Sequence, residues 1–431
     1  MASQEKYLKE AGSMSDEIDQ EVIDIVRDIL DNVRARGDDA LFEYTAKFDD
    51  VELDDLRVSD EEIAAAGDKI PDEHREAIDK TTENVTEFHE DQRDNIQGFE
   101  REFKPGISMG QRVLPVETAG VYIPGGRHPL IATPAMTIVP AVVAGVDKVV
   151  ACAPPQEDGT VSPAQLYAMD QAGADEIYSI GGAQAIGAMA FGTESVPNVD
   201  MLTGPGNVFV TEAKRQAVGR VGIDFLAGPT EVLILADESV SAELVAIDLL
   251  SQAEHDPNSR PILVTTSESL GEEVMEEIEK QLPDLRTEET ARECWNNNGE
   301  ILVVPDRETA VERGNEYAME HTQLLMENPR ELMEDLHNYG SLFIGPHAPV
   351  VFGDKAVGTN HALPTGRVAR YSSGIWVGTY LKTPTHQELT AEGAASIADH
   401  AATICEIEKT HGHQISAEVR RHDVTEEIRR D

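Results

Sequence analysis

The sequence contains only three cysteines, Cys152, Cys294 and Cys405, which lie far apart and form no CxxC pair. This scarcity argues against a disulfide framework and against a zinc site built from thiolates, and it predicts a reducing cytoplasm. Cys152 follows the apolar run at residues 149–151. It is therefore interpreted as a small buried hydrophobic residue rather than as a nucleophile.

Three further signals are missing from the chain. The most apolar region, residues 130–145, is interrupted by Pro134 and Pro140, so no stretch is predicted to span a bilayer. The first residues lack the basic start and apolar run of a signal peptide. The GxGxxG fingerprint of dinucleotide-binding folds does not occur. Together these absences predict a cytoplasmic protein without the usual nucleotide motif.

Basic residues are scarce relative to acidic ones. The chain has 35 Lys and Arg against 81 Asp and Glu, which gives a net charge of −46. A surface of this charge repels nucleic acids and anionic lipids, so neither is expected as a partner. The carboxylates are spread along the 431 residues instead of forming a tail. We expect a halophilic protein, because such a surface repels itself unless salt screens it.

From residue 111 onward, predicted strands and helices alternate and are separated by short glycine-containing turns. The strands are expected at residues 148–153, 176–180, 199–202, 232–236, 261–265, 301–304 and 341–345. This order predicts an α/β fold with doubly wound parallel sheets, in which ligands bind beyond the carboxyl ends of strands. Tyr122, Gln184 and Asn207 occupy such turns, Gln184 in one at residues 181–187. They would hold a nucleotide, although glycine turns also serve close packing alone.

One helical stretch, residues 242–256, carries a candidate metal site. Ser241 is expected to cap it and Pro257 to end it. Gln252 and His255 are three residues apart and are expected to leave the last helical turn on the same side. An imidazole beside an amide oxygen can hold a divalent cation. The alternative is a polar helix end in water, with His255 as a charge partner for the helix C-terminus.

Polar residues with acid–base or ligand character also occur later in the chain. Glu320 and His321 offer two proton-transfer groups, but neighbours in sequence usually point apart, so at most one is expected to act. Asp354 and His361 lie in a segment, residues 353–366, that is predicted to be a long irregular loop. Helical, acidic sequence is predicted from residue 383 to the end, and helices also at residues 16–34 and 60–89.

Taken together, seven segments resemble the histidinol dehydrogenase family in the same order along nearly the whole chain. They are residues 119–126, 181–187, 204–207, 227–231, 251–256, 320–321 and 358–366. The resemblance implies two incomplete Rossmann-like domains with doubly wound parallel sheets, plus helical N- and C-terminal extensions. The expected boundaries are an extension at 1–20, one domain at 21–121 and 231–372, the NAD-binding domain at 122–230, and a dimerisation arm at 373–431.

The family resemblance also implies a reaction and its cofactors. Members oxidise L-histidinol through bound L-histidinal to L-histidine, the last steps of histidine biosynthesis, with two NAD and one zinc ion per subunit. The resemblance implies that zinc is bound by Gln252, His255, Asp354 and His413. This set of nitrogen and oxygen ligands would also accept manganese or cobalt. His411 is a rival to His413, because the segment at 408–413 matches the family less well than the others.

The resemblance further implies roles for the remaining candidates. Glu320 and His321 form the acid–base pair, and a homodimer shares its active sites between subunits. Position 230 usually carries serine, and Thr230 keeps the hydroxyl group. The implied contacts are Tyr122, Gln184 and Asn207 with NAD, and Thr230, Gln252, His255, His321, Asp354, His361, Glu408 and His413 with substrate.

Three alternative functions remain open from the sequence. The first is a zinc- and NAD-dependent dehydrogenase of another amino alcohol. The second is a zinc hydrolase, in which Glu320 and a metal-bound water attack an amide. The third is a metal-binding protein without catalytic activity.

Overall fold

The computed structural model describes residues 5–12, 19–125 and 130–422. The chain divides into two compact units. The first comprises Met1–Arg93 and Val116–Tyr380, and the second comprises Asp94–Pro115 and Leu381–Asp431. The domain boundaries expected from the sequence stay a prediction. Within the described residues, no helix is both long and apolar enough to cross a membrane.

One five-stranded parallel sheet of the first unit is built from residues 118–223. Its spatial order is β7-β6-β5-β8-β9, so the strand order reverses between β5 and β8. The strands are β5 (Thr118–Tyr122), β6 (Lys148–Ala153), β7 (Glu176–Ser179), β8 (Met201–Thr203) and β9 (Gly222–Ile223), and the helices between them are α5 (Thr133–Ala144), α6 (Pro163–Ala172), α7 (Gly182–Phe191) and α8 (Val208–Ala217).

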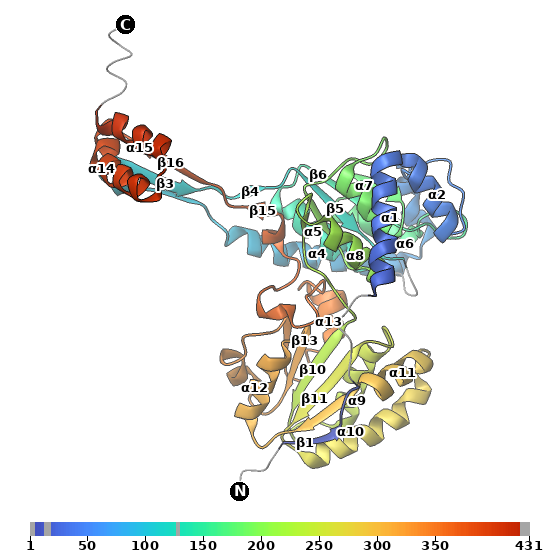
Figure 1. The fold of residues 1–431 in the computed structure, drawn as a ribbon. Coiled ribbons are helices and arrows are strands. Elements are labelled where there is room, and N and C mark those ends of the chain that lie inside the picture. Colours follow the sequence, from blue (N-terminus) through green and yellow to red (C-terminus); the bar gives the residue numbers. More distant parts are fainter. Residues whose placement is uncertain (1–4, 13–18, 126–129, 423–431) are drawn as a thin grey trace. The chain divides into compact units, whose positions relative to one another are not determined.

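Helices cover both faces of this sheet, as a parallel sheet requires. On one face, α1 (Gln20–Arg36) packs against α7 and α8, and α2 (Asp38–Phe48) packs against α7 (Figure 1). Val26, Leu30 and Val33 recur at helical spacing along α1 and are buried in this core. The other helices of this region, α3 (Asp60–Ala66) and α4 (Asp72–Asp94), are separated by a 3₁₀ turn (Gly67–Lys69) and Pro71. The single helix expected at 60–89 is therefore two helices.

The second sheet of the first unit repeats the same winding. Its order is β1-β12-β11-β10-β13-β14, and all strands except β1 are parallel. The strands are β10 (Glu231–Ala236), β11 (Arg260–Thr265), β12 (Glu300–Val303), β13 (His321–Leu325), β14 (Ser341–Ile344) and β1 (Lys6–Lys9), and the helices are α9 (Ala242–Ala253), α10 (Glu268–Gln281), α11 (Glu288–Asn298) and α12 (Arg307–Tyr317).

Alternating residues of β10 explain how this sheet is covered. Val232 and Ile234 are buried in the core that includes residues of α9, α10 and α11, whereas Leu233 and Leu235 are buried in the core that includes α12. A strand that is apolar at every position is expected where both faces are covered. The α/β fold with two doubly wound parallel sheets, predicted from the sequence, is confirmed.

The terminal regions differ from the expected helices. Residues Lys6–Lys9 form strand β1, which pairs with β12, so this part of the N-terminal extension is not helical. In the second unit, β16 (Thr385–Leu389) joins β2 (Phe99–Lys104) and β3 (Ile107–Gln111) in an antiparallel sheet. Helices α14 (Ala391–Glu408) and α15 (His411–Glu418) follow (Figure 1). The helical prediction from residue 383 fails at β16, because its hydrogen-bonding partner β3 is remote in sequence.

Two segments that were expected to be irregular contain helix. Gly181 is the N-cap of α7, so most of the turn predicted at residues 181–187 is the first part of that helix. The predicted loop at 353–366 is preceded by a short helix, α13 (Val350–Phe352), and opens with a π-helical turn, Gly353–Val357. Glycine frequency suggested turns in both places, but the short helices are stabilised by packing that the local sequence does not show.

Candidate active site

The amino ends of two adjacent strands, β10 and β13, carry the centre of the candidate site. Val232 of β10 pairs with His321, the first residue of β13. Thr230 and Glu231 therefore lie beside Glu320 and His321, since parallel neighbours begin at the same edge of a sheet. Ligands in such sheets usually bind at the carboxyl ends. This site lies at the opposite edge.

Helix α9 brings the candidate metal ligands to the same edge. It follows β10 and leads into β11, so its C-terminus returns to the edge where these parallel strands begin. Ser241 caps its N-terminus by accepting a hydrogen bond from the amide of Leu244, as predicted. The helix ends at Ala253, with Gln252 buried in its last turn. His255 lies beyond the helix end, so the expectation that both side chains leave one helical turn is wrong.

Thr230 and Glu231 hold the carboxylate of Glu320. Its Oε2 accepts hydrogen bonds from the Thr230 hydroxyl at 2.7 Å and from the Glu231 amide at 2.9 Å. The Thr230 hydroxyl also lies 3.2 Å from Oε1 of Gln252. The Thr230 hydroxyl therefore lies between Glu320, a candidate acid–base group, and Gln252, a candidate metal ligand. The expected contact of Thr230 with substrate stays a prediction.

His321 is buried between two carboxylates. Its Nδ1 lies 3.0 Å from the carbonyl oxygen of Glu231 and 3.4 Å from Oε2 of Glu320. A carbonyl oxygen can only accept, so Nδ1 carries a proton and Nε2 is the nitrogen left to gain or lose one. Nε2 lies 3.4 Å from Oδ1 of Asp354 without a hydrogen bond. Both Glu320 and His321 enter the site, because β13 begins only at His321.

The charges of this cluster shift several pKa values. Burial alone would lower the pKa of His321, but the carboxylates of Glu320 and Asp354 raise it well above its ordinary range. Burial would raise the pKa of Asp354, but His321 lowers it below the ordinary range. Burial lowers the pKa of His255 and of His361. Both imidazoles are therefore neutral near pH 7, which is the form that ligates metals.

Asp354 and His361 are connected through the π-helical turn. The main-chain oxygen of Asp354 accepts a hydrogen bond from Nδ1 of His361 at 2.7 Å, and Nε2 of His361 lies 3.4 Å from the Thr133 hydroxyl. Oδ1 of Asp354 is buried and has no hydrogen-bond partner among the residues that the structure describes. A buried carboxylate oxygen that accepts no hydrogen bond is costly unless a cation, such as a protonated His321 or a bound metal ion, neutralises it.

These residues fit a divalent cation. Gln252 supplies an amide oxygen, His255 a neutral imidazole and Asp354 a carboxylate oxygen that accepts no hydrogen bond from the described residues, a donor set that zinc accepts. Within the described residues, no three His, Cys, Asp or Glu side chains converge on a common point.

Two predicted site residues lie in the second unit. Glu408 is the last residue of α14, and His413 lies in the first turn of α15. His411 begins the same helix, and both imidazoles are exposed. The choice of His413 over His411 as a ligand stays a prediction.

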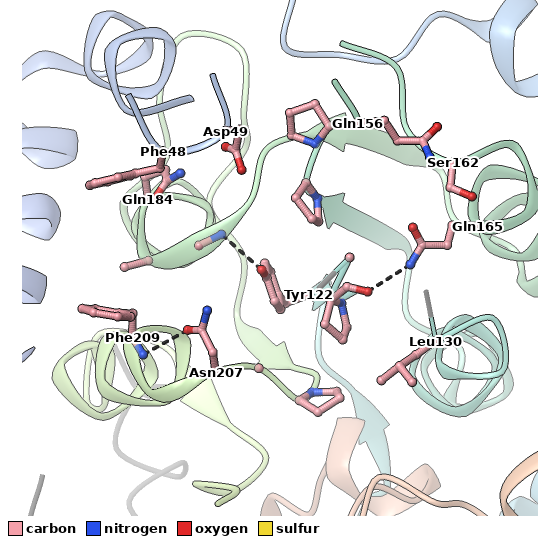
Figure 2. A pocket seen from close by; sticks show the side chains of 18 of the residues that line it. Phe48, Asp49, Tyr122, Leu130, Gln156, Ser162, Gln165, Gln184, Asn207 and Phe209 are labelled. Atoms are coloured by element: carbon pink, nitrogen blue, oxygen red, sulfur yellow. Dashed lines mark hydrogen bonds between the residues drawn. The ribbon is translucent and has the colours of Figure 1, made fainter. Parts of the chain in front are cut away.

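A cleft of about 1470 Å³ opens at the carboxyl edge of the β5–β9 sheet. It contains the three predicted NAD contacts: Tyr122 ends β5, Gln184 lies in the first turn of α7, and Asn207 caps α8 (Figure 2). The Tyr122 hydroxyl accepts a hydrogen bond from the amide of Gly182 at 3.1 Å. His255 also lines the cleft, which therefore extends to the end of α9.

Of the predicted NAD contacts, Gln184 and Asn207 carry amide side chains. Oδ1 of Asn207 accepts hydrogen bonds from the amides of Phe209 and Val210 at 3.0 and 3.1 Å, so its NH₂ group remains available to a ligand. Gln184 is buried. This edge is where a doubly wound sheet binds nucleotides, at the reversal between β5 and β8.

Sequence reasoning missed two carboxylates of these regions. Glu231 follows Thr230 and is buried, with its pKa raised to about 7 by burial. Its carboxylate accepts a hydrogen bond from the amide of Gly366 at 3.2 Å and lies 3.5 Å from the Arg260 guanidinium. Asp49 ends α2 and lines the cleft. Nothing in the sequence separates them from the other acidic residues, because the burial of Glu231 and of the Oδ2 atom of Asp49 depends on tertiary packing.

Comparison with known proteins identifies the family to which the chain is similar. Residues 13–421 match the family model described as histidinol dehydrogenase. The chain is 47% identical to a histidinol dehydrogenase from Methanococcus maripaludis, over 91% of this chain and 92% of the relative. It is 45% identical to a histidinol dehydrogenase homolog from Shouchella clausii, over 96% and 98% of the two chains.

A solved structure gives the same result for the fold. The crystal structure of histidinol dehydrogenase from Elizabethkingia anophelis superposes with a TM-score of 0.90 at 37% identity, covering 95% of this chain and 94% of that one.

Proposed function

Because the chain belongs to the histidinol dehydrogenase family, we propose that it oxidises L-histidinol through bound L-histidinal to L-histidine, using two NAD and one zinc ion per subunit. The observation that supports this most is the buried pair of His321 and Asp354. Nε2 of His321 and Oδ1 of Asp354 lie 3.4 Å apart and have no hydrogen-bond partner in the described chain. Such a pair is expected where a substrate and a cation complete the site.

Gln252, His255, Asp354 and His413 would hold the zinc ion, which when bound would fix the nitrogen atoms of the substrate, while NAD would accept hydride. Thr230, His361 and Glu408 would contact the substrate, as would His321. The cleft is larger than the roughly 300–1,000 Å³ of common ligand pockets, which supports a dinucleotide as occupant. Positioning of this kind lowers the entropy cost of bringing alcohol and nicotinamide together.

His321 is suited to remove protons in both oxidations. Nδ1 donates to the Glu231 carbonyl, which holds the ring in one orientation and leaves Nε2 to take the proton of the alcohol as hydride leaves its carbon. A cation bound to Asp354 would offset the negative charge of its carboxylate. Asp354 would then raise the pKa of His321 less than it does without a cation. The imidazole can then be neutral, as a base must be before it accepts a proton.

Glu320 is suited to act on water. Its Oε2 accepts two hydrogen bonds, from Thr230 and from the Glu231 amide, which orient the carboxylate. The aldehyde must add water before the second hydride can leave, and a positioned carboxylate can take a proton from that water. His321 would then take the proton of the hydrate as the second hydride departs.

Glu408 and His413 would reach the site of a partner subunit. They belong to the second unit, whereas the other proposed contacts belong to the first. We propose a homodimer in which each second unit completes the other subunit's site, an exchange that twofold symmetry makes reciprocal.

The test of this function is the stoichiometry of reduced nicotinamide. With limiting L-histidinol, about two NADH per molecule should form, and with L-histidinal about one. An amino alcohol without imidazole should give none. Removal of metal by a strong chelator should abolish the reaction, and zinc should restore it. Full activity in a sample shown by elemental analysis to be metal-free would contradict the zinc proposal.

A further inference from the structure

Asp49 is a carboxylate in the cleft whose hydrogen-bonding capacity is unused. It lines the cleft together with Phe48, Tyr122 and Gln184. Its Oδ2 is buried and has no hydrogen-bond partner within residues 5–12, 19–125 and 130–422. In Figure 2, Asp49 lies between Gln184 and Gln156 on one side of Tyr122, and Asn207 lies on the other. An unpaired carboxylate in a ligand cleft is a candidate for a ligand contact.

The fold does not require the Asp49 side chain. Asp49 ends α2, but this cap is made by the backbone, whose amide donates to the Thr45 carbonyl oxygen at 2.9 Å. Burial raises the pKa of Asp49 to about 6, so the folded protein disfavours its charge. A carboxylate that costs stability and has no structural partner calls for another explanation, and a ligand that donates hydrogen bonds supplies one.

The location of Asp49 identifies the part of a dinucleotide that it would meet. The Thr211 hydroxyl of α8 donates a hydrogen bond to the Ala227 carbonyl oxygen at 3.0 Å. Ala227 precedes Thr230 of the candidate active site by three residues. The side of the cleft next to β8 therefore adjoins that site. The nicotinamide must therefore bind on that side. A Cβ at Gly181, which follows β7, would lie 3.7 Å from Oδ1 of Asp49. Asp49 is thus on the β7 side, where the adenosine half would bind.

The described lining of the cleft is acidic. Four carboxylates line it, Asp49, Glu157, Asp158 and Asp256, and the described lining residues include no Lys or Arg. A phosphate on the ribose 2′-hydroxyl adds about two negative charges and removes a hydroxyl donor. A carboxylate can only accept hydrogen bonds when ionised, so it suits the two hydroxyls of an unmodified ribose and repels the phosphorylated one.

We propose that Asp49 binds the hydroxyls of the adenosine ribose and thereby makes the protein selective for NAD over its 2′-phosphorylated form, a role that rests on the proposed NAD-dependent function. In folds with the GxGxxG motif, an acidic residue about 20 positions downstream serves this purpose. Here the motif is absent, and the carboxylate comes from a helix that precedes the sheet in sequence.

The experiment measures binding directly, without histidinol. Zinc-loaded protein is titrated calorimetrically with NAD, with NADP, and with NAD that carries 2′-deoxyadenosine. Wild type, Asp49→Asn and Asp49→Ser are compared with the control Glu157→Gln. Glu157 is exposed, lines the same cleft and carries the same charge. Gln184→Ala serves as a probe of NAD binding that does not involve Asp49.

We expect Asp49→Asn to weaken NAD by about tenfold or more, the usual effect of losing a charge-assisted hydrogen bond. Asp49→Asn should weaken the deoxy analogue less than it weakens NAD, since the analogue lacks one of the two hydroxyls that Asp49 binds. Asp49→Ser should lower the ratio of NADP to NAD dissociation constants by about tenfold or more, and Glu157→Gln should change it little. The melting temperature of Asp49→Asn at pH 7 should equal or exceed that of wild type.

Three outcomes would overturn this role. The first is an equal change in the NADP ratio for Asp49→Ser and Glu157→Gln, which would indicate general charge repulsion. The second is unchanged NAD binding in both Asp49 variants while Gln184→Ala weakens it, which leaves the proposed function intact. The third is wild-type protein that binds none of the three dinucleotides, which removes the proposed function as well.

Discussion

Glu320 and His321 are neighbours in sequence whose side chains share one site but have different hydrogen-bond partners. His321→Asn should slow the oxidation of both histidinol and histidinal, by about 10²- to 10⁴-fold, because each step releases a proton. Glu320→Gln should slow histidinal oxidation more than histidinol oxidation, since only the aldehyde needs water. Steady-state rates with each substrate measure the difference. Equal losses in both reactions for Glu320→Gln would remove its role toward water.

Glu231 provides a residue-scale prediction about stability and pH. Burial raises the pKa of Glu231 from 4.5 to about 7. The nearby Arg260 lowers this pKa and the Glu320 carboxylate raises it, both by less than burial does. Folding therefore favours the protonated form, and this stabilisation is fully present below about pH 4.5 and is lost as pH rises through about 7. Glu231→Gln removes the linkage. The unfolding free energy of Glu231→Gln minus that of wild type should therefore be about 2 kcal/mol larger at pH 8 than at pH 5.

Urea unfolding of both proteins at the two pH values, in the same molar salt, measures this gain for Glu231→Gln. The exposed carboxylate of Glu157 supplies the control, because Glu157→Gln should show no such dependence on pH. A constant difference between wild type and Glu231→Gln at both pH values would contradict the raised pKa.

At the scale of elements, the turn between β8 and α8 is shaped by Gly204. Its φ is +115°, and a Cβ there would lie 2.2 Å from the Tyr122 carbonyl oxygen. The turn is held by Lys214, whose Nζ donates to the Gly204 carbonyl oxygen at 3.0 Å, and by Asp224, which accepts from the Gly204 amide at 2.9 Å. An added methyl group must displace the end of β5, where Tyr122 lies.

Gly204→Ala should therefore destabilise the protein by at least about 2 kcal/mol more than Gly219→Ala and should weaken NAD binding. Gly219 also has a positive φ, +89°, but a Cβ there meets nothing within 4 Å, so only backbone strain of about 1–2 kcal/mol is expected. Chemical denaturation compares the two variants, and calorimetry measures NAD binding. Similar destabilisation by both would show that the contact with Tyr122 is unimportant.

At the scale of the whole molecule, the net charge of −46 predicts a response to salt. Molar potassium chloride should raise both the melting temperature and the activity, because the screening length falls from about 10 Å at 0.1 M to about 3 Å at 1 M. Repulsion between surface carboxylates then weakens. A melting temperature that stays constant or falls between dilute and molar salt would count against a halophilic protein.

The proposed homodimer leads to a second whole-molecule prediction. His255→Ala and His413→Ala subunits, each inactive alone, are unfolded together and refolded as a mixture. If subunits complete each other's sites, a mixed dimer has one site with both defects and one with neither. Random pairing then restores about a quarter of wild-type activity. Samples of each variant refolded alone are the controls. Mixed dimers with no more activity than these controls would show that each site is formed within one subunit.

Several features followed directly from local sequence. Most strands of the two parallel sheets are predicted by their apolar runs, which are buried on both faces, as Val232–Ala236 shows, whereas β9 and β13 were not predicted. Ser241 was identified as a helix cap, and Cys152 as a buried residue whose pKa burial raises to about 12. These predictions succeed because period, capping and burial preference depend on residues within a few positions of one another.

The sequence by itself determined the residue types of the candidate site and the alternation of strands and helices. The tertiary structure decided which edge of each sheet carries which group. Only strand pairing shows that Glu320 and His321 lie at the amino end of β13, beside the amino end of its neighbour β10. Tyr122 lies at the carboxyl end of β5. Only packing distinguishes Asp49 and Glu231 from the other carboxylates, since burial and missing partners depend on segments far apart in the chain. Local patterns carry no information about such contacts, because these are set when remote elements pack together.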